Sequence, residues 1–543
     1  MSALPIRWVT RLGDLADAAR FVRRLPRYYQ TPIGRDEALR IVRRRLERRE
    51  DDFLDLVRRT VFENAASPYR ELFRLAGCEE GDLGRLVGQD GVEGALRALY
   101  HQGVYLTVDE LKGHRPAVRS GVAVHVDAAR LRNPLAGSHM PGRTSGSRGT
   151  ARHVPVDLEC LRDRSVNAGL TLDARGGGDW VKGVWSMSTG SLGVAIRFSG
   201  FGAPTARCFM LVDPATAGLG AHYRWSARLL RAATLLYGLP LPRAEHVPVS
   251  DPSPILRWMA EVLRAGRVPH LWAFVSPAVR LCRVALEMGL DIRGARLTIT
   301  GEPITAGRLA AIRQAGVEAM VDYGSAETGF LAHGCLAPEH PDEVHFFQDL
   351  HALIQVGADD AVAGLPAGAL LVSSLRPTAP VIFLNVSMGD RAALGPRACG
   401  CPLDSLGWTT HLHGIRSFEK LTAGGMTFLD SSVMRVLDEV LPARFGGGPT
   451  DYQLLEEEGD DGVSRVTLLV HPAIGPLSAD AVADAFLTAI GCGSGAERAM
   501  ELHWRAAKLL RVERRSPLAT TTGKILHLQQ ARAQRPPKVS IGG

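Results

Sequence analysis

Short apolar runs alternate with amphipathic stretches through the middle of the chain. The apolar runs at His270–Phe274 and Arg296–Thr300 predict two strands. Between them, Ser276 is a suitable helix N-cap, Pro277 fits the first helical position, and Gly289 lies just beyond the expected end of the helix. This order of strand, helix and strand is typical of a sheet covered by helices.

The same pattern continues directly afterwards. Thr305 can cap a helix that ends near Gly316, and Val317–Asp322 predicts a third strand. The loops that follow the second and third strands begin at Gly301 and Tyr323. Because ligands of open α/β sheets bind beyond the carboxyl ends of the strands, both loops are candidate parts of a site.

The two ends of the chain differ from its middle. Residues 1–120 are predicted to be mainly helical, with a break at Ser67-Pro68 because the residue before a proline avoids helical backbone angles. Towards the other end, Tyr452–Leu455 and Val463–Val470 flank a Gly-Asp-Asp-Gly turn, which predicts a hairpin, and Ser478 can cap the helix that follows.

These patterns predict an α/β protein with a large N-terminal domain, whose mixed or parallel sheets are covered by helices, and a small, mobile α+β C-terminal domain. We expect a helical lead-in over residues 1–120, an α/β core that carries the site over 121–412, and a small C-terminal domain over 413–543. The junction is predicted near His413-Gly-Ile-Arg416, and 543 residues suffice for several structural units.

Composition and charge exclude several classes. Hydrophobic residues at 45% and charged residues at 22% are ordinary for a globular protein, and no apolar run approaches the roughly 18 residues of a membrane span. The first residues lack the order of a signal peptide, so we expect a soluble cytoplasmic protein without a membrane partner. The net charge is +7, but the densest basic cluster, Arg40–Glu50, runs on into acidic and apolar residues. We favour a solvated face of an amphipathic helix over a nucleic-acid site.

The first candidate for chemistry is the glycine-rich stretch Gly142-Arg-Thr-Ser-Gly-Ser-Arg-Gly149. A strand at His153–Val156 and a helix capped by Asp157 are predicted to follow it. Glycines permit close backbone approach, and amide and hydroxyl groups can donate to phosphate oxygens. The stretch is therefore either a triphosphate-binding loop or a plain turn, and alone it does not decide between them.

Four further segments follow in order along the chain. Thr300-Gly-Glu-Pro303 and Asp322-Tyr-Gly-Ser-Ala-Glu-Thr328 each end a predicted strand, and Gly389-Asp390 follows an apolar strand predicted at Val381–Leu384. Ser516-Pro-Leu-Ala-Thr-Thr-Thr-Gly-Lys524 is a polar loop that ends in one lysine. Each segment taken alone has a plain explanation as a turn or a solvated tail.

Together these segments resemble the adenylate-forming superfamily, over about residues 60 to 530. The family's phosphate loop, Thr-Ser-Gly-Ser-Thr-Gly, is similar to Thr144-Ser-Gly-Ser-Arg-Gly149, and its Tyr-Gly-x-Thr-Glu segment is similar to Tyr323-Gly-Ser-Ala-Glu327. The ribose-binding Gly-Asp corresponds to Gly389-Asp390, the domain-junction arginine to Arg416, and the terminal Gly-Lys to Gly523-Lys524. Within the superfamily, Ser67–Gly77 and Tyr105–Lys112 most resemble the N-terminal region of phenylacetate–CoA ligase-like proteins.

Those relatives often carry an insert that contains cysteines. Here Cys335, His345, Cys399 and Cys401 form a Cys₃His set, which suits tetrahedral structural zinc. Ordinary reduced cysteines are the alternative, since a Cys-x-Cys pair alone is not diagnostic, and His340 is the rival fourth ligand.

The resemblance implies ATP-dependent activation of a carboxylic acid. The acid would attack the α-phosphorus of ATP, pyrophosphate would leave, and the acyl group would pass to a thiol, of CoA or of a carrier protein, or to an amine. Lys524 would contact the carboxylate and the α-phosphate, Glu327 would hold Mg²⁺, and Asp390 would accept both ribose hydroxyls. Tyr323 would stack on adenine. The full nucleotide-binding set is Thr144, Ser145, Gly146, Ser147, Gly149, Gly301, Glu302, Pro303, Tyr323, Gly324, Asp390 and Arg416.

Several departures from the family pattern leave an alternative open. Ala326 replaces a hydroxyl residue, Arg148 replaces a threonine, Arg152 stands where lysine is usual, and Phe418 falls near a usual polar hinge position. A non-catalytic nucleotide-binding homologue with a regulatory role is therefore the competing hypothesis, opposed by the retained Lys524.

The acid itself is not identified by the sequence. Trp185, Trp272 and Phe274 either line a pocket for an aromatic acid or pack in the core, which is the usual place of large aromatic residues.

Overall fold

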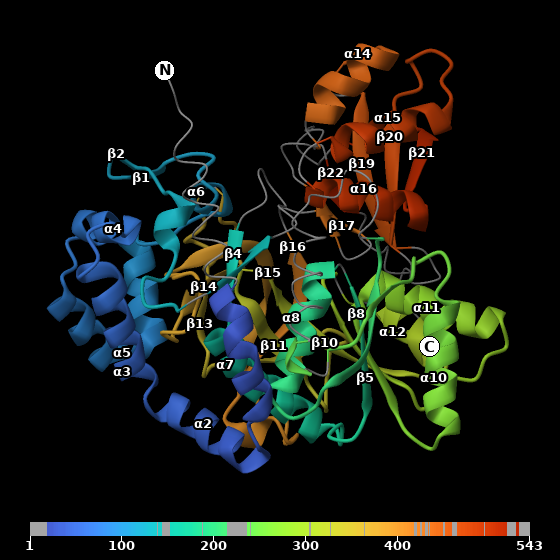
Figure 1. Ribbon diagram of the computed structural model, residues 1–543. Helices are drawn as coiled ribbons and strands as arrows, with labels where there is room; N and C mark the ends of the chain where they lie inside the picture. The colour runs from blue at the N-terminus through green and yellow to red at the C-terminus, as the bar shows by residue number, and fades with distance from the viewer. Residues whose placement is uncertain are drawn as a thin grey trace, which may run out of the picture.

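The computed structural model describes most of the chain (Figure 1). The described residues are 19–137, 139–143, 153–186, 188–213, 236–238, 241–302, 304, 306–325, 327–362, 364–417, 421–423, 426–428, 433, 435–448, 451–458, 464–492, 495–518 and 528–530. Among the described helices, none combines the length and apolarity that a bilayer crossing requires.

Helices dominate the first hundred residues and recur between the strands. They are α2 Arg35–Glu47, α3 Arg49–Val57, η1 Arg58–Phe62, α4 Pro68–Ala76, α5 Glu80–His101, α6 Val108–Leu111, η2 Ala128–Leu131, α7 Leu158–Ala174, α8 Ser188–Ser199, α10 Ser253–Arg264, α11 Val275–Glu287, α12 Ala306–Gln314, η3 Asp404–Leu406, η4 Val436–Val440, α14 Leu441–Phe445, α15 Ala479–Gly491 and α16 Gly495–Ala507.

The strands form one large sheet and several small ones. They are β1 Ala117–Arg119, β2 Val122–Val124, β3 His139–Arg143, β4 His153–Asp157, β5 Val181–Ser186, β6 Thr205–Met210, β7 Ala244–His246, β8 Pro269–Phe274, β9 Arg296–Thr300, β10 Glu318–Ser325, β11 Gly329–Gly334, β12 Val344–Phe346, β13 His351–Gln355, β14 Ala369–Ser374, β15 Val386–Pro396, β16 Thr410–Ser417, β17 Leu421–Ala423, β18 Met426–Phe428, β19 Tyr452–Glu458, β20 Ser464–Val470, β21 Leu510–Arg514 and β22 Leu528–Gln530.

The large sheet is mixed. In the described residues it has 12 strands in the order β13-β14-β15-β16-β12-β11-β10-β9-β8-β5-β6-β7. From β10 to β7 the neighbours run parallel, whereas from β10 to β13 they run antiparallel. The predicted fold class, a mixed or parallel sheet covered by helices with a smaller sheet and helices towards the C-terminus, is confirmed.

The two faces of the parallel half differ in polarity. Leu297, Ile299 and Val321 point into the main apolar core, which also contains side chains of α11 and α12. The residues between them alternate to the other face, because successive strand side chains point to opposite sides. There Thr298 and Asp322 meet α7 and α8. The sheet therefore buries polar groups on its α7 and α8 face.

The N-terminal region is helical as predicted, but one prediction about its charged residues is wrong. Helix α4 begins at Pro68 with Ser67 as its N-cap, as the Ser-Pro break predicts. The basic stretch 40–50 is helical, but the prediction that its charges are solvated is wrong for Arg45, which is only 4% exposed. Its guanidinium pairs with Asp163 at 2.7 Å and Asp349 at 3.1 Å, which ties α2 to α7 and to the segment after β12.

The C-terminal elements, which Figure 1 shows in orange and red, have a hydrophobic core of their own. Strands β19 and β20 form the predicted hairpin, with Tyr452 opposite Val470, and the Ser478 hydroxyl caps α15 by accepting the amide of Ala481. The predicted junction residues His413–Arg416 lie within β16, which belongs to the large sheet. The division of the chain at 413 stays a prediction.

Two local predictions in the middle of the chain are wrong. Helix α11 begins at Val275 with Phe274 as N-cap, so Ser276 lies inside its first turn instead of capping it. The apolar stretch Val381–Leu384 is not a strand: β15 starts at Val386 and contains Gly389-Asp390 within it. The strands predicted at His270–Phe274, Arg296–Thr300 and Val317–Asp322 are confirmed as β8, β9 and β10, and so is the cap of α7 by Asp157.

Candidate functional site

Two of the predicted nucleotide-binding segments meet at one place. The Tyr323 hydroxyl, on β10, donates to Oδ2 of Asp390, on β15, at 3.1 Å. The two residues are 67 positions apart in the chain, and they lie on strands separated in the sheet by β11, β12 and β16. Burial is the main reason that the pKa of Tyr323 lies well above its usual value, and the Asp390 carboxylate raises it further. Tyr323 is therefore a neutral donor at physiological pH.

The surroundings of Asp390 include the predicted arginine. Across the β15–β16 ladder, Asp390 pairs with Ser417 and Arg391 pairs with Arg416. The Ser417 hydroxyl donates to the Gly389 carbonyl at 3.1 Å, and Gly389 has a positive φ of 83° that favours glycine. The half-exposed Arg416 side chain forms an ion pair with Asp342 at 3.0 Å. Tyr323, Asp390 and Arg416 thus come from three strands to one region.

Glu327 lies in the tight turn between β10 and β11. The Ser325 and Thr328 side chains bond across this turn, and the Arg164 guanidinium donates to the Thr328 carbonyl at 2.7 Å. Glu327 is half-buried and lines a cavity together with Arg164, His351, Arg376 and Thr378. Among the described residues no hydrogen bond or ion pair links Glu327 to Asp390.

The Gly301-Glu302 turn follows β9 as predicted. Gly301 has a φ of 84°, a conformation that favours glycine at this position. Glu302 is 9% exposed, and its carboxylate lies 3.6 Å from the buried guanidinium of Arg308 in α12. The side chain of Glu302 is thus held towards α12.

Several predicted site residues lie outside the described residues: Thr144, Ser145, Gly146, Ser147, Gly149, Pro303 and Lys524. Gly324 is described, next to Tyr323 at the β10–β11 bulge. The backbone of β3 and β4 pairs antiparallel, from His139 opposite Asp157 to Arg143 opposite His153. In the sequence, β3 and β4 flank the hydroxyl-rich stretch.

The predicted cysteine–histidine set is brought together. The ligand atoms of Cys335, His345, Cys399 and Cys401 all lie within 4.8 Å of one another, although His345 and Cys399 are 54 positions apart in the chain. His345 Nε2 is 3.2 Å from the Cys401 sulfur and 3.5 Å from the Cys399 sulfur. The rival ligand His340 lies elsewhere, stacked on His413 with ring centroids 3.8 Å apart.

The surroundings of this cluster orient its donors. His345 Nδ1 bonds to the Trp408 carbonyl at 2.6 Å, so Nδ1 carries the proton and the Nε2 lone pair faces the sulfurs. The amides of Ala337 and Cys401 donate to the sulfurs of Cys335 and Cys399, both at 3.4 Å. Burial raises the pKa of Cys335 to about 12, whereas backbone amides outweigh burial at Cys401 and lower its pKa. The donor set fits a tetrahedral thiophilic cation such as Zn²⁺.

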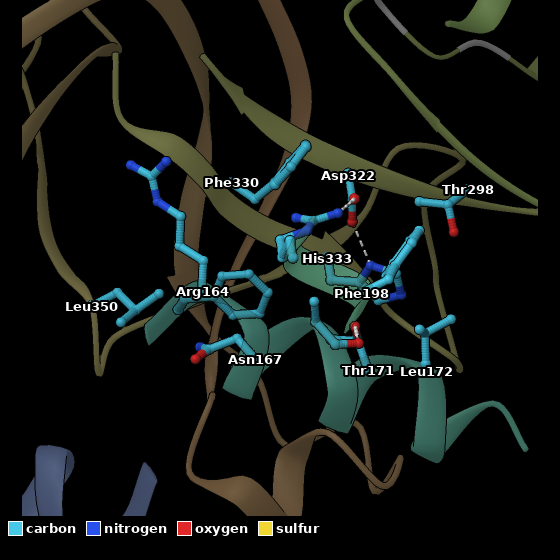
Figure 2. A pocket seen from close by; sticks show the side chains of 13 residues that line it. Arg164, Asn167, Thr171, Leu172, Phe198, Thr298, Asp322, Phe330, His333 and Leu350 are labelled. Carbon is cyan, nitrogen blue, oxygen red and sulfur yellow. Dashed lines mark hydrogen bonds and ion pairs between the residues drawn. The ribbon is translucent and has the colours of Figure 1, made fainter. Parts of the chain in front are cut away.

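A second cavity contains polar residues that sequence patterns did not point to. Arg197 of α8 lines it together with Asp322 of β10 and His333 of β11. Figure 2 shows Asp322 and His333 close to each other. Asp322 accepts from His333 Nδ1 at 2.6 Å and from Trp272 Nε1 at 3.3 Å, and it lies 3.7 Å from Arg197. A charged residue in the middle of an apolar strand is the only sequence signal that marks this site.

Burial decides the charges in this cavity. Desolvation lowers the pKa of Arg197 to about 10, which still leaves it cationic at neutral pH. Desolvation likewise lowers the pKa of His333 despite the bond to Asp322, so the imidazole is neutral. Bonds from His333 and the charge of Arg197 outweigh burial at Asp322 and lower its pKa, which keeps it ionised.

The three candidate aromatic residues have different places. Trp185 is fully buried in the core and donates to the Val247 carbonyl at 2.9 Å. Trp272 packs on Phe330 and Phe274, with ring centroids 5.9 and 6.1 Å away, and bonds to Asp322. Trp272 therefore supports the wall of the second cavity, while Trp185 belongs to the core.

No protein-family model and no curated protein matches this chain. Similar solved structures include an amide bond synthetase from Marinactinospora thermotolerans, with 13% identity and a TM-score of 0.38, over 69% of this chain and 65% of that one. The matched part is thus less than two thirds of the synthetase. An anthranilate CoA ligase in complex with anthranoyl-AMP is similar over 84% of this chain and 79% of that one, with 13% identity and a TM-score of 0.34. Acetoacetyl-CoA synthetase from Streptomyces lividans is similar over 76% of this chain and 56% of that one, with 14% identity and a TM-score of 0.33.

These similarities are too low to assign a reaction or a residue to this chain. None of the three is a phenylacetate–CoA ligase, and the resemblance to that family is not confirmed.

Proposed function

We propose that this protein activates a carboxylic acid with ATP, forming an acyl-adenylate and releasing pyrophosphate. The observation that carries the proposal is the Tyr323–Asp390 hydrogen bond of 3.1 Å, which joins two motif segments 67 positions apart. Sequence order alone does not require that contact. A common nucleotide site accounts for it, because an adenine-stacking ring and a ribose-binding carboxylate would both face one adenosine.

The side chains present fit the nucleotide. Asp390 accepts a hydroxyl hydrogen from Tyr323, the same kind of bond that ribose hydroxyls would offer. Glu327 supplies a half-buried carboxylate that would hold Mg²⁺, since hard cations prefer oxygen ligands. Lys524 would neutralise charge where the carboxylate meets the α-phosphate, and the hydroxyls of Thr144, Ser145 and Ser147 would donate to the outer phosphates.

The second half of the reaction passes the acyl group to a thiol, of CoA or of a carrier protein, or to an amine. In this proposal the C-terminal domain acts as a mobile lid that rotates about the region of Arg416 and carries Lys524 to the nucleotide. The arrangement does not favour one acceptor over another.

The Cys335, His345, Cys399 and Cys401 cluster is proposed to hold one structural zinc ion. Its four ligand atoms lie within 4.8 Å of one another, and the Trp408 carbonyl fixes the histidine tautomer that a metal ligand requires. Elemental analysis of the purified protein should give about one zinc per chain. A metal content near zero would overturn this part of the proposal.

The function is tested by pyrophosphate release with ATP, Mg²⁺ and a panel of carboxylic acids. We expect release with at least one acid, and we expect Lys524→Ala to lower its kcat by roughly 100-fold or more while ATP binding stays measurable. Lys538→Ala, which changes another lysine of the C-terminal stretch, is the matched control and should retain activity.

The competing function is nucleotide binding without catalysis. Ala326 and Phe418, at positions where relatives carry polar residues, favour it. Binding of ATP without pyrophosphate release on any acid of the panel would support this regulatory role and contradict the catalytic one. Unchanged activity of Lys524→Ala would show that the catalytic assignment of this lysine is wrong.

A further inference from the structure

The cavity beneath the strand ends is built for one small polar group. It lies between α7 and α8 on one side and β9, β10 and β11 on the other, with Phe198, Phe330 and Phe347 in its wall. Its free volume is about 20 Å³, enough for one group of the size of a water molecule. A ligand can therefore place a single polar substituent here, and the adjoining part of that ligand meets aromatic rings.

The charges at the polar end of the cavity are already balanced. Asp322 carries the negative charge and Arg197 the positive charge, 3.7 Å apart, while His333 is neutral. Arg164 also lines the cavity, but its guanidinium donates to the Thr328 carbonyl at 2.7 Å, on the side that adjoins Glu327. An added carboxylate would face the buried Asp322 anion, and an added ammonium would face the buried guanidinium, without a further counter-charge. A group that enters this space should be uncharged.

The hydrogen-bonding capacity of the cavity is not balanced. His333 Nδ1 donates to the ionised Asp322 at 2.6 Å, so the neutral ring carries a lone pair on Nε2. Within the described part of the chain this buried Nε2 has no hydrogen-bond partner, and neither has the buried Nε–H of Arg197. One acceptor and one donor are thus left for a ligand.

A hydroxyl group satisfies both atoms together, because it donates one hydrogen and accepts through its oxygen. An ether or a ketone can only accept and leaves the His333 lone pair without a donor. A methyl group leaves both atoms unpaired, and buried unpaired polar atoms are costly. Figure 2 shows Asp322 and His333 turned toward each other, with Phe198 and Phe330 among the side chains around them.

We propose that the acid activated by this protein is aromatic and carries a neutral hydroxyl group at the end of the ring distant from its carboxylate. The proposal rests on the function proposed above. The hydroxyl would bind between Arg197 Nε and His333 Nε2, and the ring would contact Phe198 and Phe330. Arg197 and His333 become specificity-determining residues, with Asp322 as the residue that positions both.

The depth of the cavity agrees with a ring of this kind. Thr298 and Asp322 lie two and three residues before the carboxyl ends of β9 and β10. At roughly 3.3 Å per strand residue, Asp322 lies about 10 Å below the end of β10, beyond which Glu327 follows, while the neighbouring Tyr323 points to the opposite face of the sheet. Arg164 and Leu350 line both this cavity and the cavity that contains Glu327, so the two are neighbours.

The test compares pairs of acids that differ only in the distant hydroxyl. Pyrophosphate release is measured with 4-hydroxybenzoate and benzoate, 4-hydroxyphenylacetate and phenylacetate, and 4-hydroxycinnamate and cinnamate, with the 4-methoxy acids as a third member of each set. We expect one of the three lengths to be used, with kcat/KM at least about 100-fold higher for the hydroxy acid than for the unsubstituted or methoxy acid. Equal values for all three would overturn the proposal, because a bound water would then be sufficient for the two polar atoms.

Two variants assign the preference to the cavity. His333→Asn keeps a donor close to Asp322 and removes the Nε2 acceptor, and we expect it to lower the hydroxy-to-unsubstituted ratio of kcat/KM by roughly tenfold or more. Arg119→Lys, which changes another buried arginine, paired with Glu110 at 2.9 Å, is the control and should leave the ratio unchanged. Because both acids are assayed on the same variant, a loss of folded protein cancels in the ratio. An unchanged ratio in His333→Asn would contradict the assignment.

Calorimetric binding of the same acids separates this inference from the proposed function. Binding of a hydroxy acid that weakens in His333→Asn, together with no pyrophosphate release from any acid, would uphold the cavity assignment and reject the catalytic function. Pyrophosphate release without preference for a hydroxyl would do the reverse.

Discussion

Two buried histidines in this protein are anchored alike and face different chemistry. His333 donates through Nδ1 to the Asp322 carboxylate at 2.6 Å, and His345 bonds through Nδ1 to the Trp408 carbonyl at 2.6 Å. In both residues the proton is thereby held on Nδ1 and the Nε2 lone pair is aimed at a defined place. His345 Nε2 faces the sulfurs of Cys399 and Cys401, whereas His333 Nε2 lies in a cavity with Arg197.

The groups around each imidazole indicate its role. Around His345 the other donors are thiols, which suits a closed metal site that stabilises the fold. Around His333 the other groups are a guanidinium and aromatic rings, which suits the recognition of an organic ligand. Removing a partner should therefore affect stability at the first site and both stability and selectivity at the second.

The largest effect is expected at the cysteine–histidine cluster. Cys401→Ser removes a thiolate ligand, and we expect the free energy of unfolding to fall by about 4–5 kcal/mol or more because metal binding contributes to folding. Urea denaturation measures this change. Cys282→Ser, at a fully buried cysteine outside the cluster, is the control and should cost only the roughly 1–3 kcal/mol of burying a hydroxyl. Equal losses in the two variants would contradict a metal site.

The next effect concerns the ion pair of the cavity. Asp322→Asn leaves the buried Arg197 without its counter-charge, and we expect a loss of about 3–5 kcal/mol in the free energy of unfolding. The double variant Asp322→Asn with Arg197→Met should recover part of this loss, because it removes the unpaired charge as well. A double variant that is less stable than the single one would show that packing, and not charge, dominates at this position.

A third buried histidine, His351, should make the stability of the protein depend on pH. In the described structure His351 has no hydrogen-bond partner at Nδ1, and burial lowers its pKa to about 3. Between the unfolded pKa near 6.5 and the folded value near 3, the unfolded chain binds a proton that the folded chain does not. Stability due to His351 is thus complete above about pH 6.5 and is lost as the pH falls towards 3, by at most about 1.4 kcal/mol per pH unit.

The measurement is urea denaturation at pH 7, 6 and 5. His351→Gln should make the decline of stability with falling pH less steep. His246→Gln, at an exposed histidine on β7, should leave the slope as it is. If His351→Gln also leaves the slope unchanged, His351 is not the group that titrates.

The smallest effect is expected from the hydroxyl that joins the two nucleotide segments. Tyr323→Phe removes its bond to Asp390 but keeps the ring, so we expect a loss of stability of about 1 kcal/mol and less than a threefold change in ATP affinity. Tyr28→Phe, which removes a 2.8 Å bond to Ser165 in a helical region, is the control. A tenfold loss of ATP affinity in Tyr323→Phe alone would mean that the hydroxyl itself contacts the nucleotide.

Local sequence patterns correctly predicted the elements that depend only on residues close together in the chain. The Ser67-Pro68 helix start, the Asp157 and Ser478 caps and the β19–β20 hairpin are all confirmed. The strand at Val381–Leu384 is wrong, because an apolar run of four residues is buried equally well without a ladder. The solvated face at Arg45 is wrong, because two distant carboxylates reach its guanidinium.

The candidate site shows the same difference between local patterns and contacts of distant residues. Glycine spacing, a proline break or a capping residue acts within a few positions, so the sequence alone determined the order of strands and helices and the residue types that could bind a nucleotide or a metal. The contact of Tyr323 with Asp390, the gathering of Cys335 with Cys401 and the meeting of Arg197 with His333 were decided by the sheet order. Each joins residues tens of positions apart, and burial removes the water that would otherwise bond to them, so only the tertiary structure sets their partners and their charge.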